Sequence, residues 1–501
     1  MRVAFDGAVT TIVDRGIRDR VARWLGRAGV QLPTLAELAC PARIREVRRT
    51  ALRTVDPDGL VPANLFRMHW YNDRSRTGIA AVPCHLVFPP ALTGVRAPIV
   101  MVLGCFFPMI GAHKMLAAYG CLIPYLVTGR FDPEGHKAVW PSTGNYCRGG
   151  IALSRVLDCR GIAVLPEGMS KERFDWLSTR VSWPEDIVRT PGSESNVKEI
   201  YDKCAELARD PANIVLNQFA EFGNYVVHYA CTGPALAQVF DTLRPARPSV
   251  RLAAFVAASG SAGTLAAGDY LKERYRTRIV VAEASECPTL LRNGFGEHNI
   301  QGIGDKHVPY IHNVMNTDIV VGVSDRSTGA LDLLFNSESR LAYLAGRRHI
   351  DPQLLTELKF IGLSGIANLV AAIKTAKRLE LGEDDVIVTV ATDSAALYGS
   401  ERRKFLAAHY PDGFDTVSAG EVFGQHLLGA ADNDVLELTH AERSRIFNLG
   451  YYTWVEQQGV PLEAFERRRA QRFWAELRRA APAWDALIAE FNAAAGLEKD
   501  C

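Results

Sequence analysis

Lys114 and a glycine-rich turn are the residues whose types best suit a shared chemistry. Lys114 heads an apolar run in "FFPMIGAHKMLAAYG", although lysine is rarely buried without a partner. Small residues that join a strand to a helix let backbone N–H groups approach an anion, and hydroxyls add donors. Taken alone, the turn is as well explained by a tight connection without a ligand, and the lysine by a helix start that reaches water. The turn consists of Gly260, Ser261, Ala262, Gly263 and Thr264.

Two further polar segments complete the set of groups that one cofactor requires. The segment "VATDSAALY" ends a buried strand with Asp393 and Ser394. Each segment alone is an ordinary polar turn. Pyridoxal phosphate needs a phosphate site, a lysine amine, a partner for its ring oxygen and a partner for its pyridine nitrogen. The other segment, "WPSTGNYCRGGIALS", supplies Ser142, Thr143, Gly144 and Asn145.

Other chemistries find no support in the sequence. It contains no H-E-x-x-H, no P-loop and no G-x-S-x-G elbow, and the turn does not satisfy G-x-G-x-x-G. The histidines between positions 298 and 312 lack metal-ligand spacing, so no metal site is predicted. Lys and Arg number 57 against 56 Asp and Glu, a net charge of +1. This balance predicts neither a nucleic-acid nor a membrane partner. Small zwitterions, such as amino acids, remain possible ligands.

The cysteines and the N-terminus predict a cytoplasmic protein. The ten cysteines are scattered without a C-x-x-C pair, which is typical of reduced thiols. The start, "MRVAFDGAVTTIVDRG", has no continuous apolar segment of the kind that signal peptides carry. The longest apolar stretch, "APIVMVLGCFFPMIGA", is broken by Gly and Pro and is too short to span a bilayer.

The elements that must position these residues follow an alternating pattern. Short β-branched runs alternate with helical patterns over residues 96–400, which predicts an α/β fold with doubly wound parallel sheets and ligands at the carboxyl ends of strands. Residues 1–95 and 401–501 read as mainly helical extensions; Trp484, Leu487, Ile488 and Phe491 share one helix face. Strands are predicted at 97–104, 160–166, 251–260, 278–284 and 385–392, and helices at 263–275 and 365–381.

In these segments the sequence resembles the cysteine synthase/cystathionine β-synthase family, the fold type II pyridoxal phosphate enzymes. The resemblance keeps its order over about residues 96–400. The most specific local match is "LPEGMSKERFDWL", which is similar to the family's Met-Pro-Glu-x-Met-Ser-x-Glu-Arg stretch. The other matching segments are "PMIGAHK", "STGN", "NQFAEFGNYVVHYACTGPAL", "GSAGTL", "HNIQGIG" and "TDSAALY".

The resemblance implies two doubly wound domains with the cofactor between them, the smaller at about residues 135–240, and a homodimer. Lys114 then holds the cofactor as a Schiff base, the turn Gly260–Thr264 binds the phosphate, and Asn145 contacts the ring oxygen. Ser394 is placed at the pyridine nitrogen, with Asp393 as the alternative. The substrate site is implied at Ser142, Thr143, Gly144, Gln301 and Gly302.

Three departures from the family pattern bear on the substrate. Lys114 stands in Gly-Ala-His-Lys-Met-Leu where the family has Gly-Ser-x-Lys-Asp-Arg. The asparagine loop carries about three extra residues, "YCR", so Arg148 is a candidate partner for the substrate carboxylate or for an additional acidic group. Ala262 replaces a glycine of the phosphate turn, and its methyl group is expected to require a negative φ.

The resemblance implies an enzyme that acts on serine, O-activated serine or cysteine. A neutral hydroxyl from Ser394 would leave the pyridine nitrogen unprotonated, which favours loss of a β-leaving group through an aminoacrylate; Asp393 in that place would remove the preference. β-Replacement by a thiol or another nucleophile is the leading prediction. The alternatives are β-elimination without a second substrate, as in an ammonia-lyase, dehydratase or desulfhydrase, and a non-catalytic protein that binds pyridoxal phosphate.

Overall fold

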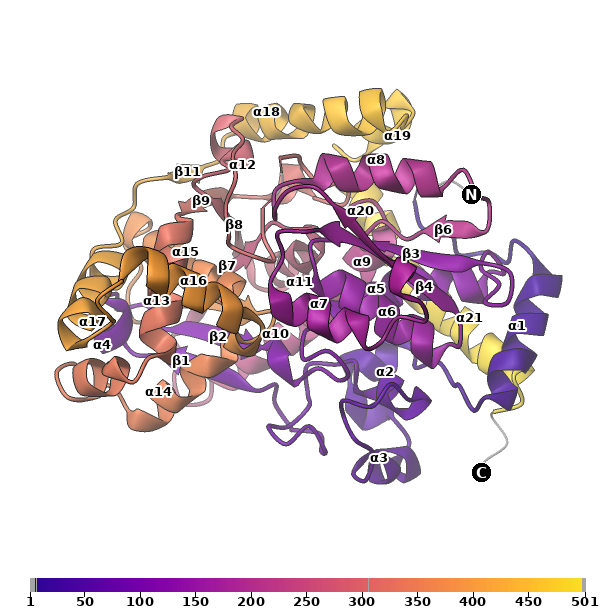
Figure 1. The fold of residues 1–501 in the computed structure, drawn as a ribbon, viewed down its shortest axis with the longest axis horizontal. Helices are drawn as coiled ribbons and strands as arrows, with labels where there is room; N and C mark the ends of the chain where they lie inside the picture. The colour runs from indigo at the N-terminus through magenta and orange to yellow at the C-terminus, as the bar shows by residue number, and fades with distance from the viewer. Residues whose placement is uncertain (1–4, 6, 305, 498–501) are drawn as a thin grey trace.

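The structure, a computed structural model, describes residues 5, 7–304 and 306–497 and is built around two sheets (Figure 1). The larger sheet has the order β1-β2-β10-β7-β8-β9-β11. Its five central strands are parallel, and the edge strands β1 and β11 pair antiparallel with their neighbours. The strands are β1 (His85–Phe88), β2 (Ile99–Leu103), β7 (Arg251–Ala258), β8 (Arg278–Ala284), β9 (Ile319–Val323), β10 (Asp385–Ala391) and β11 (Val435–Glu437).

Alternating side chains of the larger sheet enter two different cores. Val100 and Val102 of β2 belong to the core that α11 covers, whereas Ile99 and Met101 belong to the core that α13 and α15 cover. Burial on both faces explains why these strands read as continuous apolar runs. The helices beside this sheet are α10 (Gly233–Asp241), α11 (Ala266–Tyr275), α12 (Thr289–Arg292), α13 (Asp325–Asn336), α14 (Pro352–Glu357) and α15 (Leu363–Arg378).

The smaller sheet is fully parallel, with the order β5-β4-β3-β6. Val139 and Val164 pack with α8 on one face, while Trp140 and Leu165 lie in the core shared with α5 and α6. The elements are β3 (Lys137–Pro141), β4 (Arg160–Pro166), β5 (Ile187–Thr190) and β6 (Asn213–Val215), with α5 (Lys114–Val127), α6 (Asn145–Val156), α7 (Lys171–Ser178), α8 (Val197–Leu207) and α9 (Phe222–Val227).

The predicted α/β class and all five predicted strands are confirmed, within one or two residues at their ends. The helix predicted at 365–381 is α15, and the one predicted at 263–275 is a single 3₁₀ turn, Gly263–Leu265, followed by α11. Six strands were not predicted from the sequence: β1, β3, β5, β6, β9 and β11. Each is five residues long or shorter, which gives periodicity little to act on.

Both chain ends pack onto this core. β11 extends the larger sheet, and α21 contacts α1, α2 and α5. The predicted boundary at 400/401 falls inside α16. The remaining helices are α1 (Arg15–Arg27), α2 (Leu35–Ala39), α3 (Glu46–Leu52), α4 (Pro90–Thr93), α16 (Gly399–His409), α17 (Thr416–Phe423), α18 (His440–Tyr451), α19 (Leu462–Arg467), α20 (Gln471–Arg478) and α21 (Ala480–Ala494).

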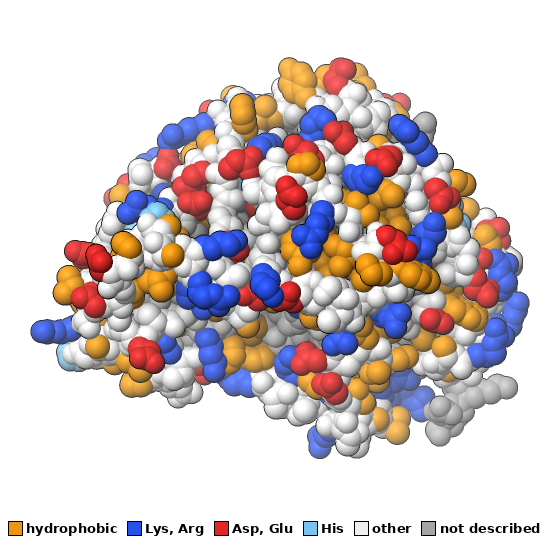
Figure 2. All heavy atoms as spheres, viewed as in Figure 1, with side chains coloured by type: hydrophobic (Ala, Val, Ile, Leu, Met, Phe, Trp, Pro, Cys, Tyr) orange, Lys and Arg blue, Asp and Glu red, His pale blue; other side chains and the backbone are white. Residues whose placement is uncertain are grey.

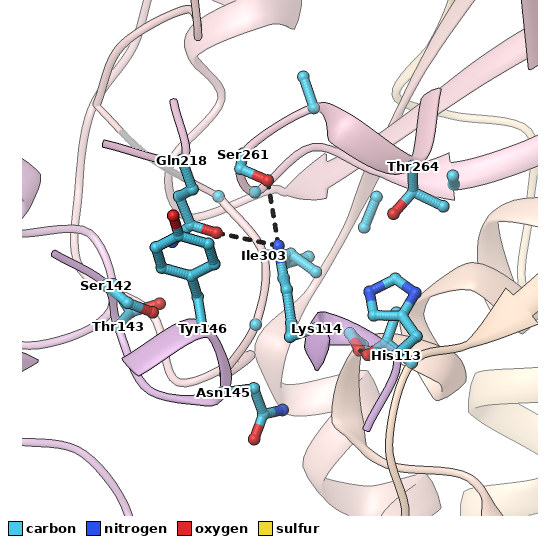
Figure 3. A pocket seen from close by; sticks show the side chains of 18 of the residues that line it. His113, Lys114, Ser142, Thr143, Asn145, Tyr146, Gln218, Ser261, Thr264 and Ile303 are labelled. Atoms are coloured by element: carbon cyan, nitrogen blue, oxygen red, sulfur yellow. Dashed lines mark hydrogen bonds between the residues drawn. The ribbon is translucent and has the colours of Figure 1, made fainter. Parts of the chain in front are cut away.

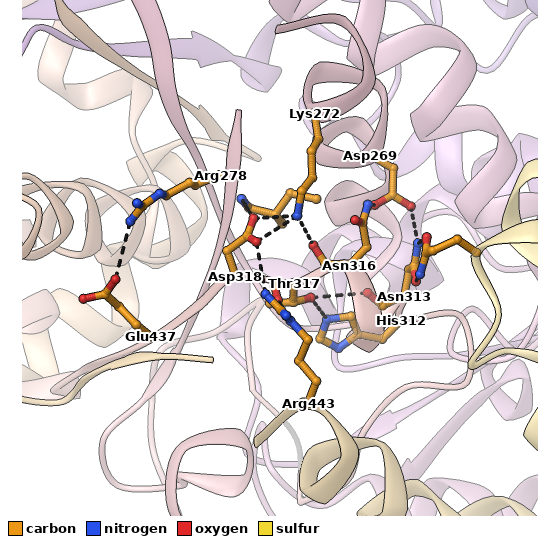
Figure 4. Close-up of polar contacts among 12 residues, drawn as sticks. Asp269, Lys272, Arg278, His312, Asn313, Asn316, Thr317, Asp318, Glu437 and Arg443 are labelled. Atoms are coloured by element: carbon orange, nitrogen blue, oxygen red, sulfur yellow. Dashed lines mark hydrogen bonds and ion pairs between the residues drawn. The ribbon is translucent and has the colours of Figure 1, made fainter. Parts of the chain in front are cut away.

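A charge cluster attaches the C-terminal region to the larger sheet (Figure 4). Asp318, just before β9, accepts hydrogen bonds at 2.8 Å from Lys272 of α11 and at 3.2 Å from Arg443 of α18. Arg443 also donates to the Thr317 carbonyl at 2.6 Å. The extension is therefore part of one packed structure with the core.

The visible surface carries charges of both signs. On the face seen in Figure 2, Lys and Arg side chains are interspersed with Asp and Glu, as the net charge of +1 leads one to expect. Among the residues that the structure describes, no helix is long and apolar enough to cross a bilayer.

Candidate active site

A cavity lies where the strand ends of the larger sheet meet the loops of the smaller one. Its empty volume, including space that is open to solvent, is about 670 Å³. Nine of the predicted site residues line it (Figure 3): Lys114, Ser142, Thr143, Asn145, Gly260, Ser261, Ala262, Thr264 and Gly302. The structure thus brings the lysine, the glycine-rich turn and the asparagine loop to one place.

Lys114 is the first residue of α5, and its amine faces the glycine-rich turn. Nζ donates to Gln218 Oε1 and to Ser261 Oγ, each at 3.0 Å (Figure 3). The backbone N–H of His113 donates to the Thr392 carbonyl at 3.0 Å, which ties the start of α5 to the end of β10. The lysine is therefore held inside a cavity rather than extended into water.

The glycine-rich turn connects β7 to α11 and is shaped for a close approach. Ser261 Oγ also accepts from Asn224 Nδ2 at 3.0 Å. A Cβ on Gly263 would collide with the Asn224 side chain, so only glycine fits there. Gly263 itself is not a lining residue of the cavity, although its neighbours Ala262 and Thr264 are.

Ala262 corrects one expectation from the sequence. Its methyl group was expected to require a negative φ, but Ala262 adopts φ +64° and ψ 0°, the left-handed conformation that glycine prefers. An alanine in this region costs roughly 1–2 kcal/mol. The turn therefore keeps the shape that a glycine would give it and carries backbone strain at the cavity wall.

Asn145 begins α6 and belongs to a buried polar network. Its Nδ2 donates to Asp393 Oδ2 at 2.6 Å, and its Oδ1 accepts from Arg148 at 3.0 Å. Tyr398 donates its hydroxyl to the same Asp393 oxygen at 2.6 Å, and Arg173 lies 4.0 Å from it. Burial raises the pKa of Asp393, and the positive charge of Arg173 opposes that shift. The Asp393 carboxylate thus points into this buried network and does not line the cavity.

Five predicted residues do not line the cavity. Arg148 is buried beneath Asn145, with its guanidinium 5.0 Å from the Trp176 ring. Gln301 is fully buried and accepts hydrogen bonds from Arg173 and from the Ser170 backbone. The other three are Gly144, Gly263 and Ser394.

Two hydroxyls that sequence reasoning missed occupy the cavity wall at the end of β10. Ser364, the second residue of α15, lies 2.9 Å from the Thr392 hydroxyl, and both side chains line the cavity. A signal was present in "IGLSGIANL", where small residues and a serine precede a helical pattern. The same pattern occurs in the loops before α6 and α11. The serine of "TDS", Ser394, was predicted as the partner of the pyridine nitrogen instead.

Glu194 is a further lining residue that the sequence did not indicate. It is 2 % exposed, and one carboxylate oxygen accepts from the Thr143 hydroxyl and, at 2.9 Å, from the Gly302 N–H. The other oxygen has no hydrogen-bond partner among the described residues. Burial raises the pKa of Glu194 to about 7, against the lowering effect of Arg173.

Sequence comparison identifies the family to which this site belongs. The profile of the family described as pyridoxal-phosphate dependent enzyme matches residues 90–393, which hold every lining residue of the cavity. The chain therefore belongs to the pyridoxal-phosphate dependent enzymes.

Individual relatives extend this result. The chain is 31 % identical over 299 residues to a probable cysteine synthase of Bacillus subtilis, covering 58 % of this chain and 86 % of that protein. It is 25 % identical over 375 residues to cystathionine beta-synthase of Saccharomyces cerevisiae, covering 72 % and 66 %. An O-acetylserine dependent cystathionine beta-synthase of Helicobacter pylori shares the fold, with a TM-score of 0.53 at 24 % identity and coverage of 65 % and 96 %.

The groups lining the cavity suit the cofactor of this family. Lys114 offers an amine directed at a turn of backbone N–H groups, beside a helix start that favours a phosphate. Ser364 and Thr392 offer neutral hydroxyls at the end of β10. Lys114 and the Gly260–Thr264 turn are thus the residues that would hold pyridoxal phosphate.

Proposed function

We propose that the protein catalyses β-replacement on an amino acid of the serine, O-activated serine or cysteine type. The observation that carries this proposal is the hydroxyl pair Ser364–Thr392 on the cavity wall, with Asp393 turned away into its own network. A neutral partner leaves the pyridine nitrogen unprotonated, which favours loss of a β-substituent over transamination. The cysteine synthase and cystathionine beta-synthase relatives support the same class of reaction.

Each lining residue has a distinct task in this proposal. The bound cofactor supplies an electron sink for the bonds at the substrate Cα. Lys114 would hold the cofactor's aldehyde through Nζ, and its amine would serve as the base that moves the proton at the substrate Cα. Gln218 and Ser261 orient this amine, each from 3.0 Å.

The substrate carboxylate is assigned to the start of α6. Ser142 supplies a hydroxyl there, and the helix start adds the positive end of its dipole. The Thr143 hydroxyl already donates to Glu194, so we assign Thr143 to shaping the loop. Arg148, predicted as a carboxylate partner, is buried beneath Asn145, so we assign it to orienting that amide. Glu194 joins the Thr143 loop to Gly302 across the cavity, which aligns the two sides of the proposed substrate site.

β-Elimination without a second substrate is the second candidate function. It uses the same residues up to loss of the leaving group, and a hydrogen sulfide-producing enzyme of Fusobacterium nucleatum shares the fold at a TM-score of 0.51 and 20 % identity. A homodimer and a cytoplasmic location remain predictions from the sequence.

An amino-acid panel distinguishes these functions. Purified protein with pyridoxal phosphate is incubated with serine, O-acetylserine, O-phosphoserine or cysteine, with and without sulfide or a thiol. β-Replacement predicts a thioether or new thiol amino acid only when the nucleophile is present. Keto acid and ammonia without a nucleophile would establish elimination, and no product from any substrate would favour the non-catalytic alternative.

Lys114→Ala is the control for the panel. We expect it to lose the internal cofactor chromophore and to lower turnover by at least about a thousandfold, the scale for a group that acts in the chemistry. An unchanged absorbance spectrum in this variant would reject Lys114 as the attachment point.

A further inference from the structure

His113 is a buried imidazole on the cavity wall that the proposed mechanism leaves unused. It precedes Lys114, is 1 % exposed and lines the cavity. Neither of its ring nitrogens has a hydrogen-bond partner among the described residues. A buried polar group left unpaired is costly, so such a group in a packed core points to a missing partner.

Within the part of the chain that the structure describes, the two rings packed against His113 do not bond to it. Trp70 meets it edge-on with ring centroids 5.7 Å apart, and its indole N–H donates instead to Thr232 at 2.9 Å. His228 lies on the other side with centroids 5.2 Å apart, and its Nδ1 also bonds to Thr232, at 2.9 Å. Thr232 is thus hydrogen-bonded without His113. Nε2 of His228 has no partner among the described residues either, so neither neighbour is seen to bond the His113 ring, whose other surroundings are the cavity that it lines.

The cavity side of the ring faces the glycine-rich turn. His113 and Thr264, the last residue of that turn, line the same cavity. In Figure 3 the ring edge that carries both nitrogens is turned toward Thr264, on the side of Lys114 away from Asn145. A ligand phosphate on the turn would therefore lie next to an imidazole N–H.

We propose that His113 donates a ring N–H to the phosphate of pyridoxal phosphate and so adds a side chain to the cradle formed by Gly260–Thr264. The burial of the ring lowers its pKa well below the usual value, so the free imidazole is neutral and carries one donor and one acceptor. One N–H is sufficient for a hydrogen bond to a dianion. The proposal rests on cofactor binding by this family and not on which reaction follows.

The test compares two aldehydes that differ only in the phosphate. Binding of pyridoxal phosphate and of pyridoxal to the full-length apoprotein is measured by absorbance, for the wild type, His113→Leu and His113→Gln. We expect His113→Leu to weaken the binding of pyridoxal phosphate by about 10- to 100-fold, the range for a hydrogen bond to a charged group. The affinity for pyridoxal should stay unchanged. His113→Gln keeps an N–H donor and should recover part of the loss.

A matched control separates the phosphate contact from packing. His228→Leu alters the same ring contact, but His228 does not line the cavity, so it should shift both affinities alike or neither. Equal loss of both ligands in His113→Leu would overturn the proposal, as would no loss of either.

A second measurement uses only the wild-type protein, so it does not depend on whether a variant folds. In wild-type protein with ¹⁵N-labelled histidine, pyridoxal phosphate should produce a slowly exchanging imidazole N–H signal that pyridoxal does not. Its absence, with the internal chromophore formed, would also overturn the proposal. Failure to form the chromophore at all would instead reject cofactor binding by Lys114.

Discussion

We expect the residue at the end of β10 to set the electronic character of the proposed cofactor site. Asp393, Ser394 and Thr392 are consecutive, yet they face three different surroundings. Asp393 accepts from Asn145 and Tyr398, Ser394 lies away from the cavity, and Thr392 lines the cavity beside Ser364. We therefore propose Ser364, supported by Thr392, as the partner of the pyridine nitrogen in place of Ser394.

Paired alanine variants test this assignment. Ser364→Ala should shift the absorbance maximum of the bound cofactor and lower kcat by about 10- to 100-fold, because it removes a hydrogen bond at the electron sink. The same two measurements on Ser394→Ala decide between the positions. If Ser394→Ala carries the spectral shift and Ser364→Ala does not, the sequence-based assignment is right.

Glu194 gives the site a pH-dependent stability. Its pKa is raised from 4.5 to about 7, so the folded protein holds a proton that the unfolded chain has already lost between these values. The wild type should therefore lose stability as pH rises from about 4.5 to 7 and stay less stable above that. Glu194→Gln removes this loss and should be the more stable protein at pH 8, by roughly 1–3 kcal/mol, with a smaller difference at pH 5.

Denaturant unfolding at the two pH values measures this effect. Glu185→Gln, a change at an exposed carboxylate, serves as the control and should show little pH-dependent difference. A Glu194→Gln difference that stays constant between pH 5 and pH 8 would contradict the expectation.

At the scale of elements, the cavity is built from helix starts placed at strand ends. Lys114 begins α5, Asn145 begins α6, and Ser364 is the second residue of α15. Each start places a residue on the wall of the cavity. The Gly260–Thr264 turn adds a fourth such junction, so each contributing side chain is held by a rigid element.

Two adjacent positions of the turn should respond in opposite ways to exchange of glycine and alanine. Gly263→Ala places a methyl group against Asn224 and should weaken binding of pyridoxal phosphate at least about tenfold, a loss of roughly 1.4 kcal/mol. Ala262→Gly relieves a left-handed alanine at the cost of chain entropy, so stability should stay level or rise by up to about 1 kcal/mol. Cofactor titration and thermal unfolding measure both; destabilisation by Ala262→Gly would be the contrary result.

At the scale of the whole molecule, the C-terminal helix supports the element that carries the lysine. α21 packs against α1, α2 and α5, and Asp485 accepts from the N–H groups of Leu35 and Ala36 at the start of α2. Trp484, Leu487, Ile488 and Phe491 are all buried, as their spacing predicts. The extension therefore acts as part of the scaffold of the active site.

Phe491→Ala tests this structural role. Phe491 is fully buried, so its truncation should lower the free energy of unfolding by about 3–5 kcal/mol and weaken retention of the cofactor through α5. Ala489→Ser, on the exposed side of α21, should change stability by less than about 0.5 kcal/mol. Urea unfolding and cofactor retention on dialysis give the two measurements, and a Phe491→Ala protein as stable as the wild type would show that α21 is dispensable.

Sequence reasoning succeeded where a local pattern reports a local environment. The apolar runs identify the buried parallel strands, and the strand–turn–helix junctions point to Lys114, Asn145 and the Gly260–Thr264 turn. Nine of the predicted site residues line one cavity. Ser394 and Arg148 do not line the cavity, and no pattern in the sequence indicated this, because which way a polar side chain turns depends on partners far away in the sequence. Asp393 is 248 residues from Asn145, and only packing brings them together.

The sequence by itself determined the fold class and the lysine, the turn and the asparagine loop, because strand burial and helix starts are written in short segments. Only the tertiary structure decided which hydroxyl reaches the cavity, that Ala262 adopts a left-handed conformation, and that Glu194 and His113 line the same cavity as Lys114. Those outcomes depend on burial and on contacts between distant segments, and a pattern along the chain does not contain them.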